Sequence, residues 1–300
     1  MSWAEVVTPG DRETFRRCRR AWDLGSPRRR NLAPREPPPP TLEDALRAAL
    51  AVYYYPGMWR WDRALPAGRV GHAFEELCPP EARDLGASLL ERYLAWAPGV
   101  DDFEPLQVNG EFDVTIPDPH RPRSDLRTLE GVPLRFRGTV DLLAIDPARE
   151  YWIVHHCVAA RLAEEGAFAV DPEGAAACWA WGRCHLAQPI AGVVYNEVCW
   201  DGGPGLRRTQ VRRGAVEQEG AALSLGLELR DSLVPEVRIY PSFAWPSCRT
   251  CAFLRPCAAV ETGADAEAIL AADYEERGAP ERRLGMTTWG LGRGAAPPRR

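Results

Sequence analysis

The feature that most constrains the fold of this chain is a set of cysteines near its two ends. Three of them form a C-x2-C-x5-C run: Cys248, Cys251 and Cys257. Cysteines at positions i and i+3 can direct two thiolates at one metal, and soft thiolates favour zinc or an iron-sulfur centre over hard cations. A tetrahedral site needs a fourth ligand, and Cys18 is the best candidate. The pattern therefore predicts a metal centre that ties the two ends together.

The other cysteines have no ligand spacing, and we expect them to pack in the core; they are Cys78, Cys157, Cys178, Cys184 and Cys199. Disulfides are disfavoured because nine cysteines is an odd number, and because the sequence begins without the basic and apolar regions of a secretory signal. No apolar run approaches the roughly 20 residues of a membrane span. We therefore expect a cytoplasmic protein with no membrane partner.

Charge is unevenly distributed along the chain. The net charge of the 300 residues is −5, yet nine arginines face four acidic residues through position 35, and five arginines face one from position 281 onward. Such basic footprints can follow phosphates. Candidate DNA contacts surround the first cysteine, with a tryptophan for base stacking: Arg16, Arg17, Arg19, Arg20 and Trp22. The alternative is a solvated helix face.

Hydrophobic periodicity predicts helices at both ends of the chain and strands in its middle. Helices are expected at 11–23, 41–54, from about 67, at 80–97, 172–186 and 216–234, and strands at 106–116, 132–145, 151–158, 190–198 and 207–213. We interpret residues 1–278 as a single α/β domain with its core at 105–200, and residues 279–300 as a flexible tail.

One predicted hairpin brings polar residues together. The turn 146–150 joins two strands, so directly paired positions sum to 296 and Asp141 faces His155. Opposed residues share a face of the sheet, and Cys157 follows on that face. His156 is expected to point away from Asp141 and to be structural.

Several motifs, in the expected order, resemble the PD-(D/E)XK nuclease superfamily, specifically its RecB-like, AddB-like and CRISPR-adaptation exonuclease members with a four-cysteine iron-sulfur cluster. The Phe15-x2-Cys18-x-Arg20-x-Trp22 segment is similar to their first-ligand helix, and the C-terminal cysteine run to their last three ligands. Gly68-x3-His72 resembles their first active-site motif. The strand 138–143 resembles the one that bears their metal-binding aspartate, here Asp141.

The resemblance implies a restriction-endonuclease-like mixed central sheet flanked by helices, with helical segments at 11–24 and 247–278 joined by the four-cysteine cluster. It implies a 4Fe-4S cluster on those cysteines, although the residues alone leave zinc open. It also implies Mg²⁺ or Mn²⁺ at the reaction centre, with DNA and DNA-processing proteins as partners.

The reaction centre departs from the family pattern. The carboxylate-x-lysine pair is replaced by His155-x-Cys157, and all 37 basic residues of the chain are arginine, so no lysine can substitute. A Gln-x3-Tyr motif is replaced by Ala177-x3-Trp181. With His72 and His155 neutral, Asp141 is the only anionic ligand, a set that suits Zn²⁺, Mn²⁺ or Fe²⁺ better than Mg²⁺.

Three hypotheses follow from these observations. The first is an iron-sulfur protein of nuclease fold that binds DNA or a DNA-processing complex with lost or strongly reduced phosphodiesterase activity. The second is a divergent manganese-dependent exonuclease that uses His72, Asp141 and His155. The third is a zinc-stabilised protein-interaction module.

Overall fold

A mixed sheet lies at the centre of the computed structural model, which describes residues 6–60, 64–185, 188–201, 205–234 and 236–278. Its strands are hydrogen-bonded in the order β1-β6-β7-β8-β9, and β3 also pairs with β6. Because β3 pairs along the whole of β6, β1 and β7 both lie along the opposite side of β6, one near each of its ends. The β7–β8 and β1–β6 pairs are parallel, and the other pairs are antiparallel. The strands are β1 Val6–Val7, β3 Glu104–Thr115, β6 Arg135–Ile145, β7 Tyr151–Ala159, β8 Ile190–Cys199 and β9 Leu206–Arg212.

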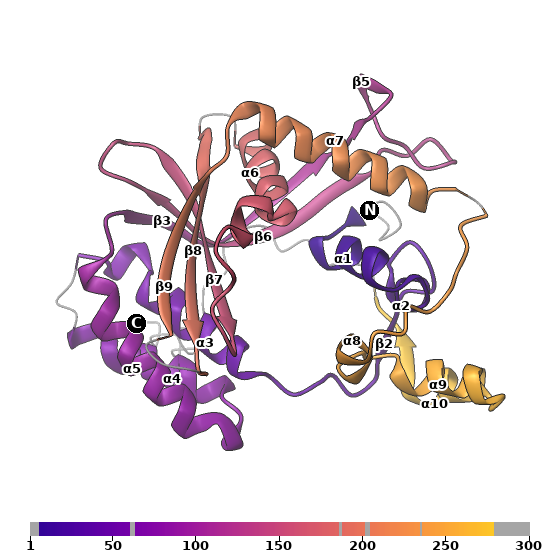
Figure 1. Ribbon diagram of the computed structural model, residues 1–300, viewed down its shortest axis with the longest axis horizontal. Helices are drawn as coiled ribbons and strands as arrows, with labels where there is room; N and C mark the ends of the chain where they lie inside the picture. Colours follow the sequence, from indigo (N-terminus) through magenta and orange to yellow (C-terminus); the bar gives the residue numbers. More distant parts are fainter. Residues whose placement is uncertain (1–5, 61–63, 186–187, 202–204, 235, 279–300) are drawn as a thin grey trace, which may run out of the picture.

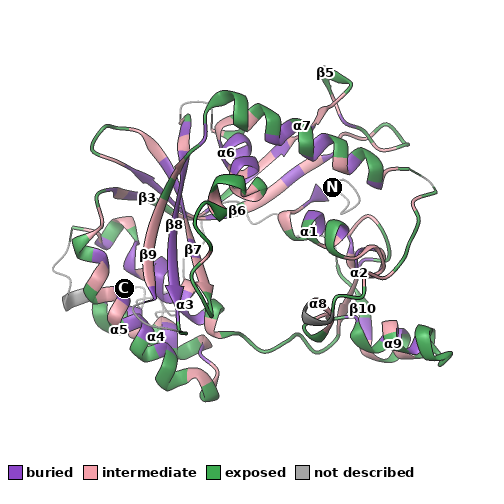
Figure 2. Ribbon diagram, viewed as in Figure 1, coloured by how far each residue is buried: buried purple, intermediate pink, exposed green. Residues whose placement is uncertain are grey.

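Helices cover both faces of this sheet (Figure 1). On one face lie α3 Leu42–Tyr53, α4 Ala64–Leu77 and α5 Arg83–Trp96; on the other lie α6 Pro172–Cys184 and α7 Ala215–Ser232. Each layer buries its own apolar cluster against the sheet, and Figure 2 shows these buried surfaces on the strands and the inner sides of the helices. The predicted mixed α/β sheet flanked by helices is therefore confirmed.

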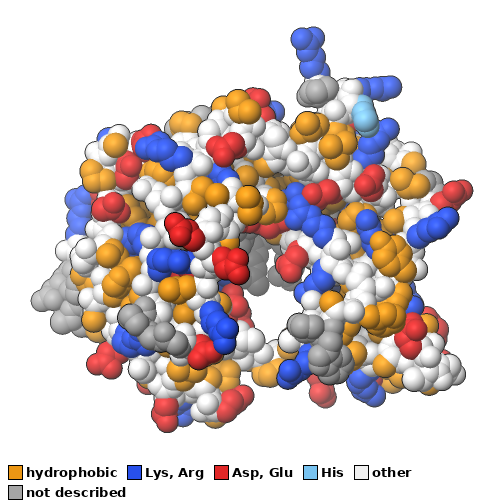
Figure 3. Space-filling model, in the orientation of Figure 1, with side chains coloured by type: hydrophobic (Ala, Val, Ile, Leu, Met, Phe, Trp, Pro, Cys, Tyr) orange, Lys and Arg blue, Asp and Glu red, His pale blue; other side chains and the backbone are white. Residues whose placement is uncertain are grey.

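The two ends of the described chain fold together beside these layers. We call this part the terminal module; it contains α1 Pro9–Arg17, α2 Arg19–Gly25, β2 Leu32–Pro34, α8 Trp245–Arg249, α9 Leu254–Thr262, α10 Ala266–Asp273 and β10 Tyr274–Glu276. The strands β2 and β10 pair antiparallel, and a small core closes around Leu24, Phe253 and Tyr274. The space-filling view shows the molecule hollowed between this module and the sheet (Figure 3).

Local sequence signals explain several element boundaries. Thr41 caps α3 through a capping box, because its hydroxyl accepts from the backbone N–H of Asp44 while the Asp44 carboxylate accepts from the Thr41 N–H. The predicted helix at 11–23 is wrong as a single element. Cys18 adopts an extended conformation, with φ −159° and ψ 114°, and so ends α1 and begins α2.

The remaining elements are short. The hairpin β4 Pro117–Asp118 and β5 Arg121–Asp125 extends beyond the sheet. Short 3-10 helices lie at Pro56–Met58, Pro80–Ala82, Ala97–Gly99 and Ala167–Val170. None of the described helices combines the length and the apolar composition of a membrane-spanning segment. The predicted tail at 279–300 lies outside the described residues.

Candidate functional site

Asp141 occupies the point where strands β6 and β7 separate. The ladder between these strands follows the predicted register from Ile145 opposite Tyr151 to Leu142 opposite Val154. Beyond that pair, the Asp141 carboxylate takes the place of a backbone acceptor, because its Oδ2 accepts from the backbone N–H of His156 at 2.8 Å. The Asp141 side chain therefore hydrogen-bonds to β7 at the point where the two strands separate, which we call the strand opening.

Two cationic side chains flank the same carboxylate. Nδ1 of His155 lies 3.0 Å from Oδ2 of Asp141, so the convergence expected from the hairpin register is confirmed. From helix α3, Nη1 of Arg47 donates to Oδ1 at 3.2 Å. Arg47 is also paired with Glu43 one turn earlier, at 2.9 Å. Both oxygens of Asp141 therefore already have protein partners.

The ionisation of this group follows from the same contacts. Burial alone would raise the pKa of Asp141, but the hydrogen bond and charge of His155, with the charges of His156 and Arg47, hold that pKa well below its ordinary value. Burial would lower the pKa of His155, yet its hydrogen bonds to Asp141 and Cys157 raise it to about 10. At neutral pH the pair is therefore a carboxylate and an imidazolium.

His156 faces the opposite way, as predicted. It is buried, and its ring stacks on Tyr54 with centroids 5.5 Å apart and an interplanar angle of 19°. Burial lowers the pKa of His156 to about 4, so the ring is neutral at pH 7. Its role is to pack the α3 layer against the sheet.

The structure does not bring the predicted reaction-centre residues together as one metal site. His72 is exposed on α4, whereas Asp141 and His155 meet at the strand opening. Across the described ranges, no group of three or more His, Cys, Asp or Glu side chains is arranged so that it could hold a metal ion. Sequence reasoning missed Arg47: its charge within an otherwise apolar helical stretch indicated an ionic partner but did not identify Asp141.

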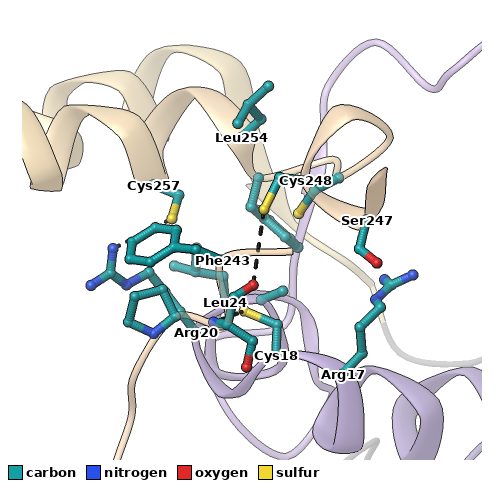
Figure 4. A pocket seen from close by; sticks show the side chains of 14 residues that line it. Arg17, Cys18, Arg20, Leu24, Phe243, Ser247, Cys248, Leu254 and Cys257 are labelled. Atoms are coloured by element: carbon teal, nitrogen blue, oxygen red, sulfur yellow. Dashed lines mark hydrogen bonds between the residues drawn. The ribbon is translucent and has the colours of Figure 1, made fainter. Parts of the chain in front are cut away.

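All four predicted cysteine ligands line a single pocket in the terminal module (Figure 4). Cys18 comes from the α1–α2 junction, Cys248 and Cys251 from α8 and the turn after it, and Cys257 from α9. All four are half-buried. Apolar side chains, including Leu24, Phe253 and Phe243, complete the lining.

Several polar groups already contact these sulfurs. The backbone N–H of Ser242 donates to Sγ of Cys18 at 3.5 Å, and Nη1 of Arg20 donates to Sγ of Cys257 at 3.3 Å. Burial raises the pKa of the Cys251 thiol, with a contribution from the charge of Cys18. Donors beside thiolate sulfurs are typical of iron-sulfur sites. The donor set therefore fits a thiolate-bound metal in its chemistry, but the cysteines in this arrangement do not form an assembled metal centre.

The predicted DNA contacts differ in their availability. Arg16 is paired with Glu173 and Glu228, at 3.2 and 2.5 Å, which joins α1 to α6 and α7. Arg20 is paired with Glu261 at 2.7 Å. These ion pairs join helices that are distant in the sequence, and the predicted contacts of Arg16 and Arg20 with DNA stay a prediction.

The other three predicted DNA contacts are Arg17, Arg19 and Trp22, of which Arg19 and Trp22 pack against Phe15. The guanidinium of Arg19 lies 3.2 Å from the centroid of the Phe15 ring, a cation–π contact. Arg17 is 41% exposed and lies 3.8 Å from Glu13, a long ion-pair contact within α1. Trp22 is 1% exposed and packs edge-on against Phe15, so its predicted role in base stacking does not fit this structure.

The expectation that the other cysteines pack in the core holds for Cys78, Cys178 and Cys199, which are buried. It is wrong for Cys184, which is exposed near the end of α6. Cys157 is half-buried beside His155.

Comparisons with known proteins are sparse. No protein-family model matches the chain, and no curated protein matches it. Among solved structures, the chain is similar to the crystal structure of SSO0001, with 12% sequence identity and a TM-score of 0.35 over 73% of this chain and 85% of that one.

Proposed function

We propose that this protein is a DNA-binding member of the nuclease-like α/β class that has lost, or strongly reduced, phosphodiesterase activity. The observation that carries the proposal is that both oxygens of the Asp141 carboxylate are already paired, Oδ1 with Arg47 at 3.2 Å and Oδ2 with His155 at 3.0 Å. The mixed sheet flanked by helices is consistent with the expected architecture.

The positive charges of Arg47 and His155 oppose hydrolysis because they disfavour a catalytic metal ion at Asp141. Phosphodiester cleavage by Mg²⁺ or Mn²⁺ requires several oxygen ligands on the protein to hold the ion. A divalent cation at Asp141 would have to displace the Arg47 guanidinium and approach an imidazolium whose pKa is raised to about 10. Like charges at this distance repel, and the chain has no lysine to activate water. These features favour binding without cleavage.

We also propose that the four pocket cysteines would hold a 4Fe-4S cluster, with zinc as the alternative. The support is that Cys18, Cys248, Cys251 and Cys257 line one pocket although the first lies more than two hundred residues before the others. When bound, such a cluster would supply a covalent staple between the two halves of the terminal module. DNA-processing proteins remain the expected protein partners.

Metal analysis after anaerobic purification tests the cofactor. We expect about four irons and four sulfides per chain with a broad visible absorption band, and loss of both in Cys18→Ala but not in Cys184→Ala, which removes an exposed thiol elsewhere. Zinc in place of iron, unaffected by Cys18→Ala, would contradict the cluster and favour a zinc-stabilised interaction module.

Binding and cleavage assays test the function. We expect labelled duplex or single-stranded DNA to bind with an affinity that falls steeply between 50 and 200 mM salt, and to remain intact with Mg²⁺ or Mn²⁺. Absence of binding at low salt would refute the proposal. Manganese-dependent cleavage that disappears in Asp141→Ala would instead favour the divergent exonuclease, and His72→Ala and His155→Ala would then test the other two predicted residues.

A further inference from the structure

The β4–β5 hairpin is an arm that stands out from the sheet (Figure 1). Its base is fixed by three backbone hydrogen bonds among buried residues: Ile116 donates to Leu134 at 3.0 Å, Leu126 to Ile116 at 2.7 Å, and Leu134 to Leu126 at 2.8 Å. These three side chains are at most 3% exposed and belong to the core between the sheet and α6–α7. The arm therefore has a rigid base.

Helix α7 also holds the arm. Gly226 of α7 approaches the arm so closely that a Cβ there would lie 2.9 Å from the Pro117 carbonyl oxygen. Beside it, Arg230 pairs with Asp118 at 3.5 Å, and the same carboxylate accepts from the backbone N–H of His120 at 2.9 Å. The acidic residue nearest to the tip is thereby occupied, and the direction of the arm is fixed.

The outer part of the arm is basic. His120, Arg121 and Arg123 are all exposed, and Figure 3 shows basic side chains projecting from the molecule at this place. Two other highly exposed arginines of the described chain are paired, Arg60 with Glu104 at 2.8 Å and Arg161 with Asp201 at 3.6 Å. Among the residues that the structure describes, no carboxylate lies within ion-pair distance of Arg121 or Arg123.

Shape and spacing point to the kind of partner. Arg121 and Arg123 are separated by two positions in one strand, so their side chains leave the same side of the strand about 6.6 Å apart. A two-stranded β-ribbon is also narrow enough to enter the major groove of B-DNA. We propose that this arm contacts duplex DNA and that Arg121 and Arg123 bind its phosphates. The inference rests on the proposed function. It places DNA contacts on the β4–β5 arm, which the sequence motifs did not identify as a DNA-binding surface.

Fluorescence anisotropy with a labelled 20-base-pair duplex tests the arm. Each phosphate contact contributes about 0.9 to the slope of log K against log salt concentration, so Arg121→Ala/Arg123→Ala is expected to lower that slope by about 1.8 and the affinity by about 30-fold at 0.15 M salt. The charge-matched control, Arg60→Ala/Arg161→Ala, should leave both nearly unchanged. Arg121→Lys/Arg123→Lys should restore most of the binding, and thermal melting of each variant verifies the fold.

The outcomes separate the two proposals. If wild type binds the duplex and Arg121→Ala/Arg123→Ala binds equally well, the arm is not a DNA contact, although the protein still binds DNA. Equal losses in the test and control variants would also overturn the inference, because they would reflect net charge alone. If wild type binds neither duplex nor single-stranded DNA at low salt, the proposed function itself fails. Binding of the arm to an acidic peptide but not to the duplex would refute the assignment of DNA as its partner.

Discussion

Replacement of Asp141 by asparagine should reveal the ion pair at the strand opening. Asn keeps an oxygen that can accept from the His156 backbone but removes the charge beside His155 and Arg47. A pKa of His155 raised from 6.5 to about 10 corresponds at full strength to roughly 5 kcal/mol. Because the His155 side chain is 43% exposed and solvent screens the pair, we expect a loss of about 2 kcal/mol in the free energy of unfolding.

The sign of the pH dependence distinguishes this mechanism from a general packing defect. Since folding raises the pKa of His155, its stabilising contribution is complete below about pH 6.5 and is lost as pH rises towards 10. The pKa of Asp141 is lowered, so its contribution is present above about pH 4 and is lost as pH falls further. The penalty of Asp141→Asn should therefore be largest near pH 5.5 and clearly smaller at pH 9.5.

Urea denaturation at pH 5.5, 7.5 and 9.5 provides the measurement, together with NMR titration of the His155 ring. Asp113→Asn is a matched control, because Asp113 pairs with Arg135 and Arg137 at 2.6 and 2.8 Å and arginines do not titrate in this range. Its penalty should not change between pH 5.5 and 9.5. A wild-type His155 that titrates near 6.5, or an Asp141→Asn penalty independent of pH, would refute the reasoning.

Two further predictions concern packing, one at a buried ion pair and one at a close approach of two strands. Arg12 is 1% exposed and lies 2.6 Å from Glu228, so Arg12→Ala should lower the free energy of unfolding by on the order of 3 kcal/mol. The control Arg17→Ala should lower it by less than about 0.5 kcal/mol. Equal effects of the two substitutions in chemical denaturation would contradict a structural role for the buried pair. Gly192→Ala would place a Cβ against the Val211 carbonyl oxygen, so we expect the Tm to fall by several degrees. An unchanged Tm would show that β8 and β9 can separate without cost.

The sequence was most informative where structure is local. A five-residue turn sets the register of the β6–β7 hairpin, so the meeting of Asp141 and His155 could be predicted from their positions alone. The start of α3 could also be predicted, because Thr41 and Asp44 lie within one helical turn. In both cases the residues that decide the geometry are separated by no more than about fifteen positions.

Long-range contacts left weaker signals. Arg47 lies 94 positions before Asp141, and nothing in its own helix specifies that partner. The β4–β5 arm was missed because its prolines and polar residues lack strand periodicity. The break at Cys18 was missed because the flanking residues favour a helix, while packing of α2 against the C-terminal segments, including a hydrogen bond from the Arg20 N–H to the Tyr240 carbonyl at 3.0 Å, favours two short ones.

The pairing of β2 with β10 has a consequence for biosynthesis. Leu32 pairs with Glu276, so the partner of β2 leaves the ribosome more than two hundred residues after it. At 5–20 residues per second this delay is roughly 12–48 s. Throughout that interval α2 and β2 lack the C-terminal segments that bury their apolar side chains. The strands of the layered α/β sheet are all synthesised before β10, whereas the terminal module cannot close until this last strand has left the ribosome.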